Sequence, residues 1–137
     1  MSEENVETVR RYLRAYEQLD VEKGISFMHP DVTWRAIEGA PDDIGVFRGH
    51  QAMRDYYQEW IDIFADPRSE LVEDLIEVGD RVVAVVRYIG RIKGSAKEVE
   101  MTLAIVFTIR DGKIASGREY ATRGEALEAA GLREQTN

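Results

Sequence analysis

The chain has 137 residues, a formal net charge of −8 at pH 7 and no cysteine. This length fits a single domain spanning residues 1–137, with enough chain to bury a core. Disulfides, thiolate nucleophiles and cysteine-based metal sites are excluded. The acidic surplus argues against nucleic acid and anionic membranes, because both are bound through clustered Lys and Arg. With no signal-peptide pattern and no long apolar run, we expect a cytoplasmic protein.

The first half of the sequence predicts helices. Apolar residues recur at helical spacing from Val6 to Tyr16, as on the buried face of an amphipathic helix. His29-Pro30 and Asp66-Pro67 are interpreted as the ends of a second and a third helix, because the residue before proline avoids helical conformation. The predicted helices span residues 3–19, residues 21–28, and residues from about 50 to the Asp66-Pro67 pair.

The second half predicts strands. Within residues 98–110 an apolar side chain recurs at every second position, from Val99 to Ile109, so that these side chains share one face, which is typical of a strand. Gly79-Asp80 and Asp111-Gly112 are tight-turn signals. A shorter strand, Val32–Trp34, precedes a loop rich in Gly and Pro at residues 38–45. The later predicted strands span residues 68–78, 81–91, 98–110 and 113–122, and a short helix follows at 123–130.

This order of elements predicts an α+β fold. Helices come first and a meander of long strands follows, so a parallel sheet built from βαβ units is excluded. We expect a strongly curved, mostly antiparallel sheet covered by the three N-terminal helices, with a short C-terminal helix. Such a sheet encloses a single internal pocket on its concave face.

A family resemblance is carried by short segments spread over the whole chain: Val9–Leu13, His29–Trp34, Phe47–His50, Gly79–Val82, Phe107–Ile114, Arg118–Tyr120 and Ala126–Leu132. In these segments the chain resembles the SnoaL-like branch of the nuclear transport factor 2-like superfamily. That superfamily also contains ketosteroid isomerases, polyketide cyclases and limonene-epoxide hydrolases. The resemblance implies a cone-shaped α+β barrel, often dimeric through the outer face of its sheet. It leaves the activity open, because one fold hosts many functions.

Two catalytic sets that the resemblance implies are incomplete in this sequence. For the isomerases, Tyr12 matches the tyrosine of the first helix, but Ala36 and Ile105 stand at the two acid positions. For the cyclases, the acid–base pair needs a late His and an Asp, and the Asp position falls near Thr122. The only histidines, His29 and His50, lie in the first half of the chain.

Arg87 and Glu119 form the strongest candidate pair. They match the Arg and one acid of the epoxide-hydrolase set, while Ile89 occupies the other acid position. Glu119 shares its strand face with small residues, namely Ala115, Gly117 and Ala121. Small side chains predict open volume beside the carboxylate. A buried Arg needs a partner, and Glu119 is the expected one. The pair is either a structural ion pair or a functional one in which Arg87 tunes Glu119 as a general base.

Asp74 is a second acid candidate. It shares strand parity with Ile76 and Val78, which would turn it inward, and a register error of one residue would place it in solvent. His29 is expected to close a turn and His50 to lie in solvent. Isolated histidines make a poor metal site, so we predict no metal and no cofactor.

Aromatic and apolar side chains are expected to line the pocket. The loop from Ile37 to Phe47 is expected to form a lid at the pocket mouth, where its acidic side chains disfavour an anionic ligand. The predicted pocket residues are Tyr12, Tyr16, Phe27, Trp34, Phe47, Tyr57, Trp60, Met101 and Ile105.

Three functions stay open from the sequence. The first is a pocket protein that binds a small, largely apolar molecule. The second is an enzyme, similar to an epoxide hydrolase or isomerase, that uses Glu119 with Arg87. The third is a protein–protein interaction module, with Tyr88, Val106 and Tyr120 on an exposed sheet face. A homodimer through the outer sheet face would consume that surface.

Overall fold

The computed structural model describes residues 2–40 and 43–131. Its helices are α1 (Ser2–Glu17), α2 (Val21–Ser26), α3 (His50–Ile63) and α4 (Arg123–Ala130). Its strands are β1 (Met28–Arg35), β2 (Phe47–Arg48), β3 (Phe64–Leu71), β4 (Ile76–Val78), β5 (Arg81–Ile92), β6 (Glu98–Arg110) and β7 (Lys113–Tyr120). The predicted bounds of β6 and α4 are therefore confirmed.

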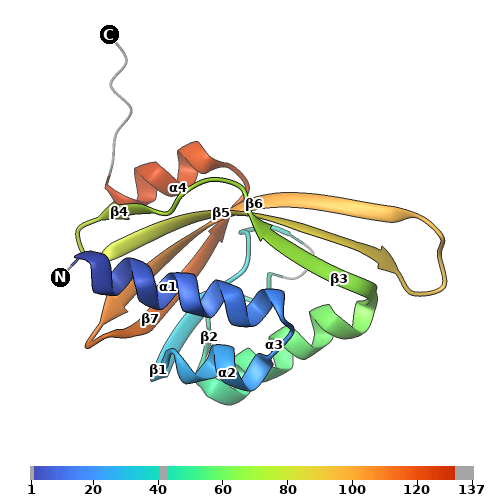
Figure 1. The fold of residues 1–137 in the computed structure, drawn as a ribbon, viewed down its shortest axis with the longest axis horizontal. Coiled ribbons are helices and arrows are strands. Elements are labelled where there is room, and N and C mark those ends of the chain that lie inside the picture. The colour runs from blue at the N-terminus through green and yellow to red at the C-terminus, as the bar shows by residue number, and fades with distance from the viewer. Residues whose placement is uncertain (1, 41–42, 132–137) are drawn as a thin grey trace, which may run out of the picture.

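The strands form one curved sheet in the order β2-β1-β7-β6-β5-β3, with β4 paired to β5. The pair β1–β7 is parallel and the other pairs are antiparallel. Figure 1 shows α1, α2 and α3 on the concave side and α4 on the opposite side. The predicted α+β fold is confirmed, as a mixed sheet that stays open at its edges.

Two proline pairs that were interpreted as helix ends lie in strands. Helix α2 ends at Ser26, and His29-Pro30 belongs to β1, where the pairing with β7 shifts register between Met28 and Thr33. Helix α3 ends at Ile63, and Asp66-Pro67 belongs to β3, where a similar shift interrupts the pairing with β5. Proline is tolerated at such bulges because no ladder hydrogen bond needs its missing N–H.

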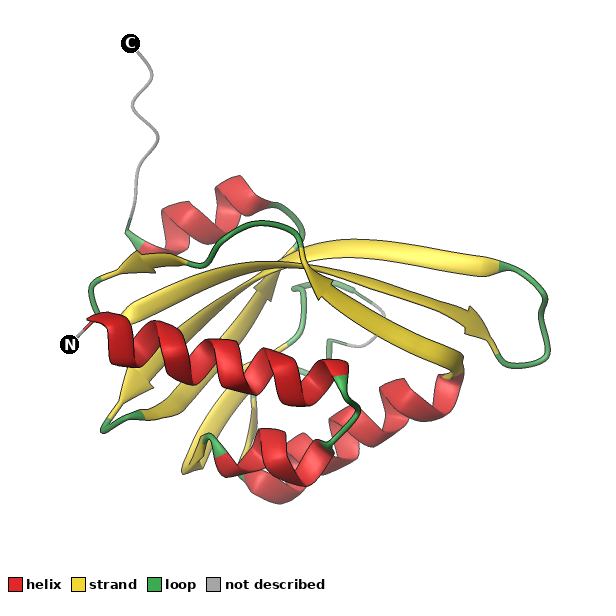
Figure 2. Cartoon of the chain, viewed as in Figure 1, coloured by secondary structure: helices red, strands yellow, loops and turns green. Residues whose placement is uncertain are grey.

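The sheet carries a hydrophobic core on each face. The larger core lies between the concave face and helices α1–α3 and includes Trp34, Ile105 and Phe107. The smaller one joins Val85 and other side chains of the outer face to α4. Because β5 contributes side chains to both cores, both of its faces are apolar over much of its length. Figure 2 shows the β5–β6 hairpin extending beyond the helices at one end.

Candidate functional site

A buried carboxylate lies at the centre of the concave face. Strand β7 places Glu119 opposite Ile105 of β6, and its side chain is only 7% exposed. One carboxylate oxygen, Oε2, accepts a hydrogen bond from Nε1 of Trp34 and another from the hydroxyl of Tyr56, each at 2.8 Å. Two donors thus converge on one oxygen of this carboxyl group. Whether Glu119 is catalytic stays a prediction.

The space beside Glu119 is filled, contrary to the prediction from its small neighbours. Trp34 reaches across from β1 and packs against Gly117 so closely that a Cβ there would lie 2.6 Å from Cη2 of the indole. Ala121 lies beyond the end of β7 and is exposed. The small residue at 117 thus accommodates a tryptophan ring, and no open floor remains.

Aromatic side chains enclose Glu119 in a niche of about 10 Å³. A space of this volume is close to the smallest that holds one water molecule. The hydroxyls of Tyr12 and Tyr57 are hydrogen-bonded to each other within this shell. The described residues that line the niche are Tyr12, Tyr16, Trp34, Tyr56, Tyr57, Trp60, Tyr88, Leu103 and Glu119.

Three tyrosines of this shell, Tyr16, Tyr57 and Tyr88, are held in their neutral form. Burial raises the pKa of Tyr16 and of Tyr57, and the negative charge of Glu119 raises both further. Burial also raises the pKa of Tyr88 well above its usual range, with a smaller contribution from neighbouring acidic groups that include Glu119. The hydroxyls therefore remain hydrogen-bond donors at every physiological pH.

Arg87 does not pair with Glu119, because the two side chains lie on opposite faces of the sheet. Nη1 of Arg87 donates to Glu70 at 2.7 Å. Nε lies 3.2 Å from Oε1 of Glu100, an ionic contact without hydrogen-bond alignment. Arg87 shares its face with Val85, which packs against α4. The predicted Arg87–Glu119 pair is therefore wrong, as is the idea that Arg87 tunes this carboxylate.

Asp74 does not face the pocket. Residues 72–75 form the connection between β3 and β4, so the strand predicted over 68–78 is interrupted there. The side chain of Asp74 is exposed in this connection. Strand parity has no meaning outside a strand, which is why the inward orientation predicted for Asp74 is wrong.

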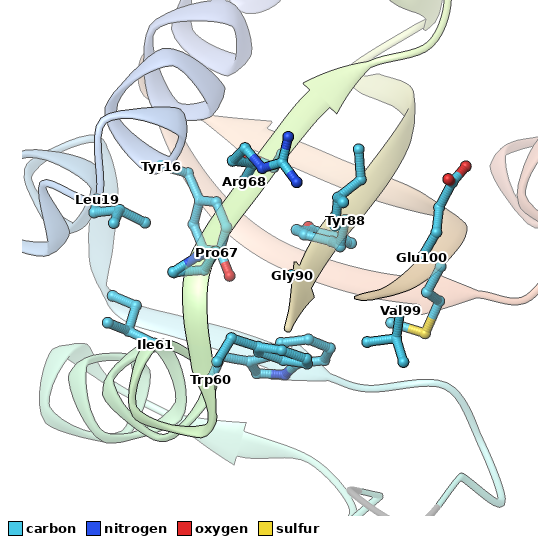
Figure 3. A pocket seen from close by; sticks show the side chains of 14 residues that line it. Tyr16, Leu19, Trp60, Ile61, Pro67, Arg68, Tyr88, Gly90, Val99 and Glu100 are labelled. Atoms are coloured by element: carbon cyan, nitrogen blue, oxygen red, sulfur yellow. The ribbon is translucent and has the colours of Figure 1, made fainter. Parts of the chain in front are cut away.

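A larger cavity, of about 210 Å³, opens beside the niche. It lies between the C-terminal ends of α1 and α3, strand β3 and the inner face of the β5–β6 hairpin (Figure 3). Its walls are mainly apolar, and the figure shows Tyr16, Trp60 and Tyr88 turned toward the same space. The lining residues are Tyr16, Leu19, Trp60, Ile61, Phe64, Pro67, Arg68, Ser69, Tyr88, Ile89, Gly90, Val99, Glu100 and Met101.

The predicted pocket residues divide between three places. Tyr16, Trp60 and Met101 line the open cavity. Tyr12, Trp34 and Tyr57 belong to the niche around Glu119, as Tyr16 and Trp60 also do. Ile105 is buried in the core, and Phe27 and Phe47 are half-buried at its margin.

Several cavity residues were missed by the sequence interpretation. Tyr88 was placed on the outer surface, yet it packs against the inner core. The alternation along β5 groups it with Ala84 and Val86, and this parity was the signal that could have located it. Phe64 was assigned to the third helix, whereas it begins β3.

The loop expected to be a lid is fastened to the sheet. Arg35 donates to both carboxylate oxygens of Asp43, which also accepts from the backbone N–H groups of Gly39 and Gly45. These hydrogen bonds, with that of Arg35 foremost, hold the pKa of Asp43 well below its usual range. No described residue of the segment 37–47 lines the open cavity, and Pro41 and Asp42 lie outside the described residues.

The outer face offers less apolar surface than expected. Val106 and Tyr120 pack in the core beneath α4, and Tyr88 lies on the other side of the sheet. Tyr88, Val106 and Tyr120 therefore do not form the exposed face that was predicted for an interaction module. The homodimer through this face stays a prediction. Within the described part of the chain, no three metal-ligating side chains gather and no helix is long and apolar enough to cross a membrane.

Comparisons with known proteins support the fold. The family model described as a SnoaL-like domain matches residues 9–117. Among curated proteins, the comparison finds no match. Among solved structures, TerC co-crystallised with polyporic acid is 24% identical with a TM-score of 0.75, and the match covers 93% of this chain and 98% of that one.

Two further structures from bacteria are similar. A nuclear transport factor 2-like protein from Burkholderia xenovorans LB400 is 26% identical with a TM-score of 0.70, covering 95% of this chain and 97% of that one. A protein with a ketosteroid isomerase-like fold from Catenulispora acidiphila DSM 44928, in complex with trimethylamine, is 19% identical with a TM-score of 0.72. That match covers 96% of this chain and 98% of the other. At such identities the likeness establishes the fold alone.

Proposed function

The chain belongs to the family of SnoaL-like domains, and from this premise we propose that it binds a small, largely apolar molecule. The binding site is the open cavity between the β5–β6 hairpin and helices α1 and α3. One observation carries the proposal: a cavity of about 210 Å³ with mainly apolar walls. Small-molecule sites in proteins are typically concave and apolar, with few polar groups.

The cavity also offers specific polar contacts. The side chains of Tyr16 and Tyr88 line the cavity, and each carries a hydroxyl. These hydroxyls are the polar groups that we expect to contact a polar atom of a ligand. Apolar walls supply affinity through burial, while the two hydroxyls fix the orientation. Similar proteins have been solved with polyporic acid and with trimethylamine, which is consistent with a small organic ligand.

The proposal is tested with N-phenyl-1-naphthylamine, a neutral dye that brightens in apolar sites. We expect saturable binding of one dye per chain, followed by its fluorescence. Val99→Trp places a large ring in the cavity and is expected to weaken binding at least tenfold. Thr102→Trp adds the same ring to the exposed outer face of the same strand and serves as the matched control. Unsaturable binding, or equal binding by both variants, would contradict the proposal.

Acid–base catalysis at Glu119 is a second candidate. The observation that favours it is that Glu119 is the one buried charged side chain in the described part of the chain. Catalytic acids are often buried in this way, although structural carboxylates are too. Assays with small cyclic epoxides and unsaturated ketones would test it, with Glu119→Gln expected to abolish turnover while circular dichroism stays unchanged. An unfolded Glu119→Gln variant would show that the carboxylate is structural.

A further inference from the structure

A second cleft, lined by basic side chains, lies along α1. Its volume is about 300 Å³, and it shares no described lining residue with the open cavity or with the niche around Glu119. Its described lining residues are Arg11, Arg14, Ala15, Gln18, Lys23 and Phe27. Three of these residues are bases and none is an acid, in a chain whose formal net charge is −8.

Helical spacing places the polar lining from α1 on one face of that helix. Arg14 follows Arg11 by three residues, and Gln18 follows Arg14 by four. Side chains three and four residues apart are neighbours on a helix surface. Ala15 belongs to the same face and is buried beneath them. The two guanidinium groups and the amide therefore form a row of hydrogen-bond donors beside a small apolar side chain.

Helix α2, which lies alongside α1 (Figure 1), adds the third base. The N–H of Asp20 donates to the carbonyl of Ala15 at 2.9 Å and so joins the start of α2 to α1. Lys23 follows in the first turn of α2, and Phe27 caps the C-terminal end of this helix. The carbonyl of Phe27 accepts from the N–H of Ile114 at 2.9 Å, which fixes this end to β7. Both walls of the cleft are thus anchored.

Two acidic side chains of the same helices are engaged with other residues. Glu7 of α1 accepts a hydrogen bond from Nε of Arg11 at 3.2 Å, so it compensates one of the three bases. Glu22 of α2 is held by Arg54 of α3 at 2.7 Å. The lining of the cleft therefore keeps a surplus of positive charge, carried by its other two bases, although the chain as a whole is acidic.

We propose that this cleft binds a small organic phosphate, meaning a phosphate monoester with an apolar part. The phosphate contacts Arg14 and Lys23, and the apolar part lies against the half-buried ring of Phe27. A guanidinium group matches two phosphate oxygens at once, and a phosphate monoester carries about 1.5 to 2 negative charges at neutral pH. The net charge of −8 repels long polyanions such as nucleic acid, so the ligand is a small one.

The test uses phenyl phosphate as the probe and two comparison compounds. Inorganic phosphate keeps the charge without a ring, and benzyl alcohol keeps a ring without the charge. Binding to the full-length protein is followed by NMR titration of the backbone amides of α1 and α2 at low ionic strength. We expect saturable shifts with phenyl phosphate, about tenfold weaker binding of inorganic phosphate because it buries no ring, and no shifts there with benzyl alcohol. Equal binding of inorganic phosphate would overturn the assignment to an organic phosphate.

Matched variants distinguish a site from general attraction to positive charge. Arg14→Gln combined with Lys23→Gln removes two charges from the cleft and is expected to weaken phenyl phosphate binding at least tenfold. Lys93→Gln combined with Lys97→Gln removes two charges from the turn between β5 and β6 and should change binding less than twofold. All four side chains are exposed, so neither double variant should disturb the fold. Unsaturable shifts, or equal weakening by both double variants, would overturn the inference.

A third variant separates this cleft from the open cavity. Val99→Trp fills the open cavity, whose lining residues are distinct from those of the cleft. We expect this variant to lose binding of N-phenyl-1-naphthylamine and to keep the shifts that phenyl phosphate causes in α1 and α2. Loss of phenyl phosphate binding in Val99→Trp would place this ligand in the open cavity and overturn the inference, while the proposed function would stand.

Discussion

The contact between Gly117 and Trp34 supports a sharp prediction about the centre of the site. A Cβ at residue 117 would lie 2.6 Å from Cη2 of Trp34 and nearer still to two other atoms of the ring. The indole is fully surrounded, with a relative exposure of 2%, so it has no free volume into which to move. We therefore expect Gly117→Ala to displace the ring and weaken the hydrogen bond from Nε1 to Glu119.

The magnitude follows from two terms. Overpacking a dense core costs typically about 1–3 kcal/mol. A weakened hydrogen bond to a charged group adds about 1.5–3 kcal/mol. We therefore expect the free energy of unfolding to fall by about 3 kcal/mol or more, a large part of the total for a domain of this size. The midpoint of thermal unfolding should fall by roughly 10 °C.

The assay is urea unfolding followed by tryptophan fluorescence, with circular dichroism as a second probe. Gly124→Ala is the matched control, because a Cβ at this exposed helical position meets nothing within 4 Å. In helix α4 this substitution should be neutral or stabilise the protein by up to about 1 kcal/mol. Combining Gly117→Ala with Trp34→Phe should cost less than the sum of the two single changes, because the smaller ring relieves the clash. A Gly117→Ala protein as stable as the parent would refute this account of the packing.

Three other predictions concern titration and association. Because the pKa values of Tyr16, Tyr57 and Tyr88 are raised on folding, the contribution of these tyrosines to stability should be constant below about pH 10 and be lost above it; absorbance at alkaline pH should show these tyrosines ionising only on unfolding. Because the pKa of Asp43 is lowered, its contribution should be present above about pH 4 and be lost as the pH falls further; Asp43→Asn should abolish that part of the acid dependence while Arg35 stays charged. Sedimentation velocity should detect the predicted homodimer, and a monomer at high protein concentration would contradict it.

The fold was largely predictable from local patterns. The alternation in residues 98–110 and the capped, glycine-terminated helix at 123–130 correspond to β6 and α4 without a shift in bounds. Tight turns and the recurrence of apolar side chains at every second position are properties of neighbouring residues, so the sequence displays them directly. The two proline pairs were misinterpreted because a helix end and a strand bulge both tolerate proline, and only the distant partner strand distinguishes them.

The candidate site was less predictable because alternation does not reveal which face of a strand is inside. On β5, Val83 and Val85 point outward under α4, while Ala84 and Val86 point into the main core. Both faces therefore look buried in the sequence. Arg87 was grouped correctly with the valines, yet their face was taken for the inner one. The helix that covers the outer face is distant in the sequence, and its position decides the question.

The position of the cavity follows from a mismatch in length between the sheet and its helices. Strand β5 has 12 residues and β6 has 13, whereas α3 has 14. A strand rises about 3.3 Å per residue and a helix about 1.5 Å, so the hairpin extends roughly twice as far as the helix beneath it. Near Glu119 the helices press aromatic side chains against the sheet and fill the space. Beyond the ends of α1 and α3 the inner face of the hairpin has no such cover, and Leu19, Ile63 and Met101 remain 40%, 51% and 37% exposed. The same architecture thus buries Glu119 at the closed end and leaves an apolar cavity at the open end. The rings of Tyr16, Trp60 and Tyr88 line both spaces.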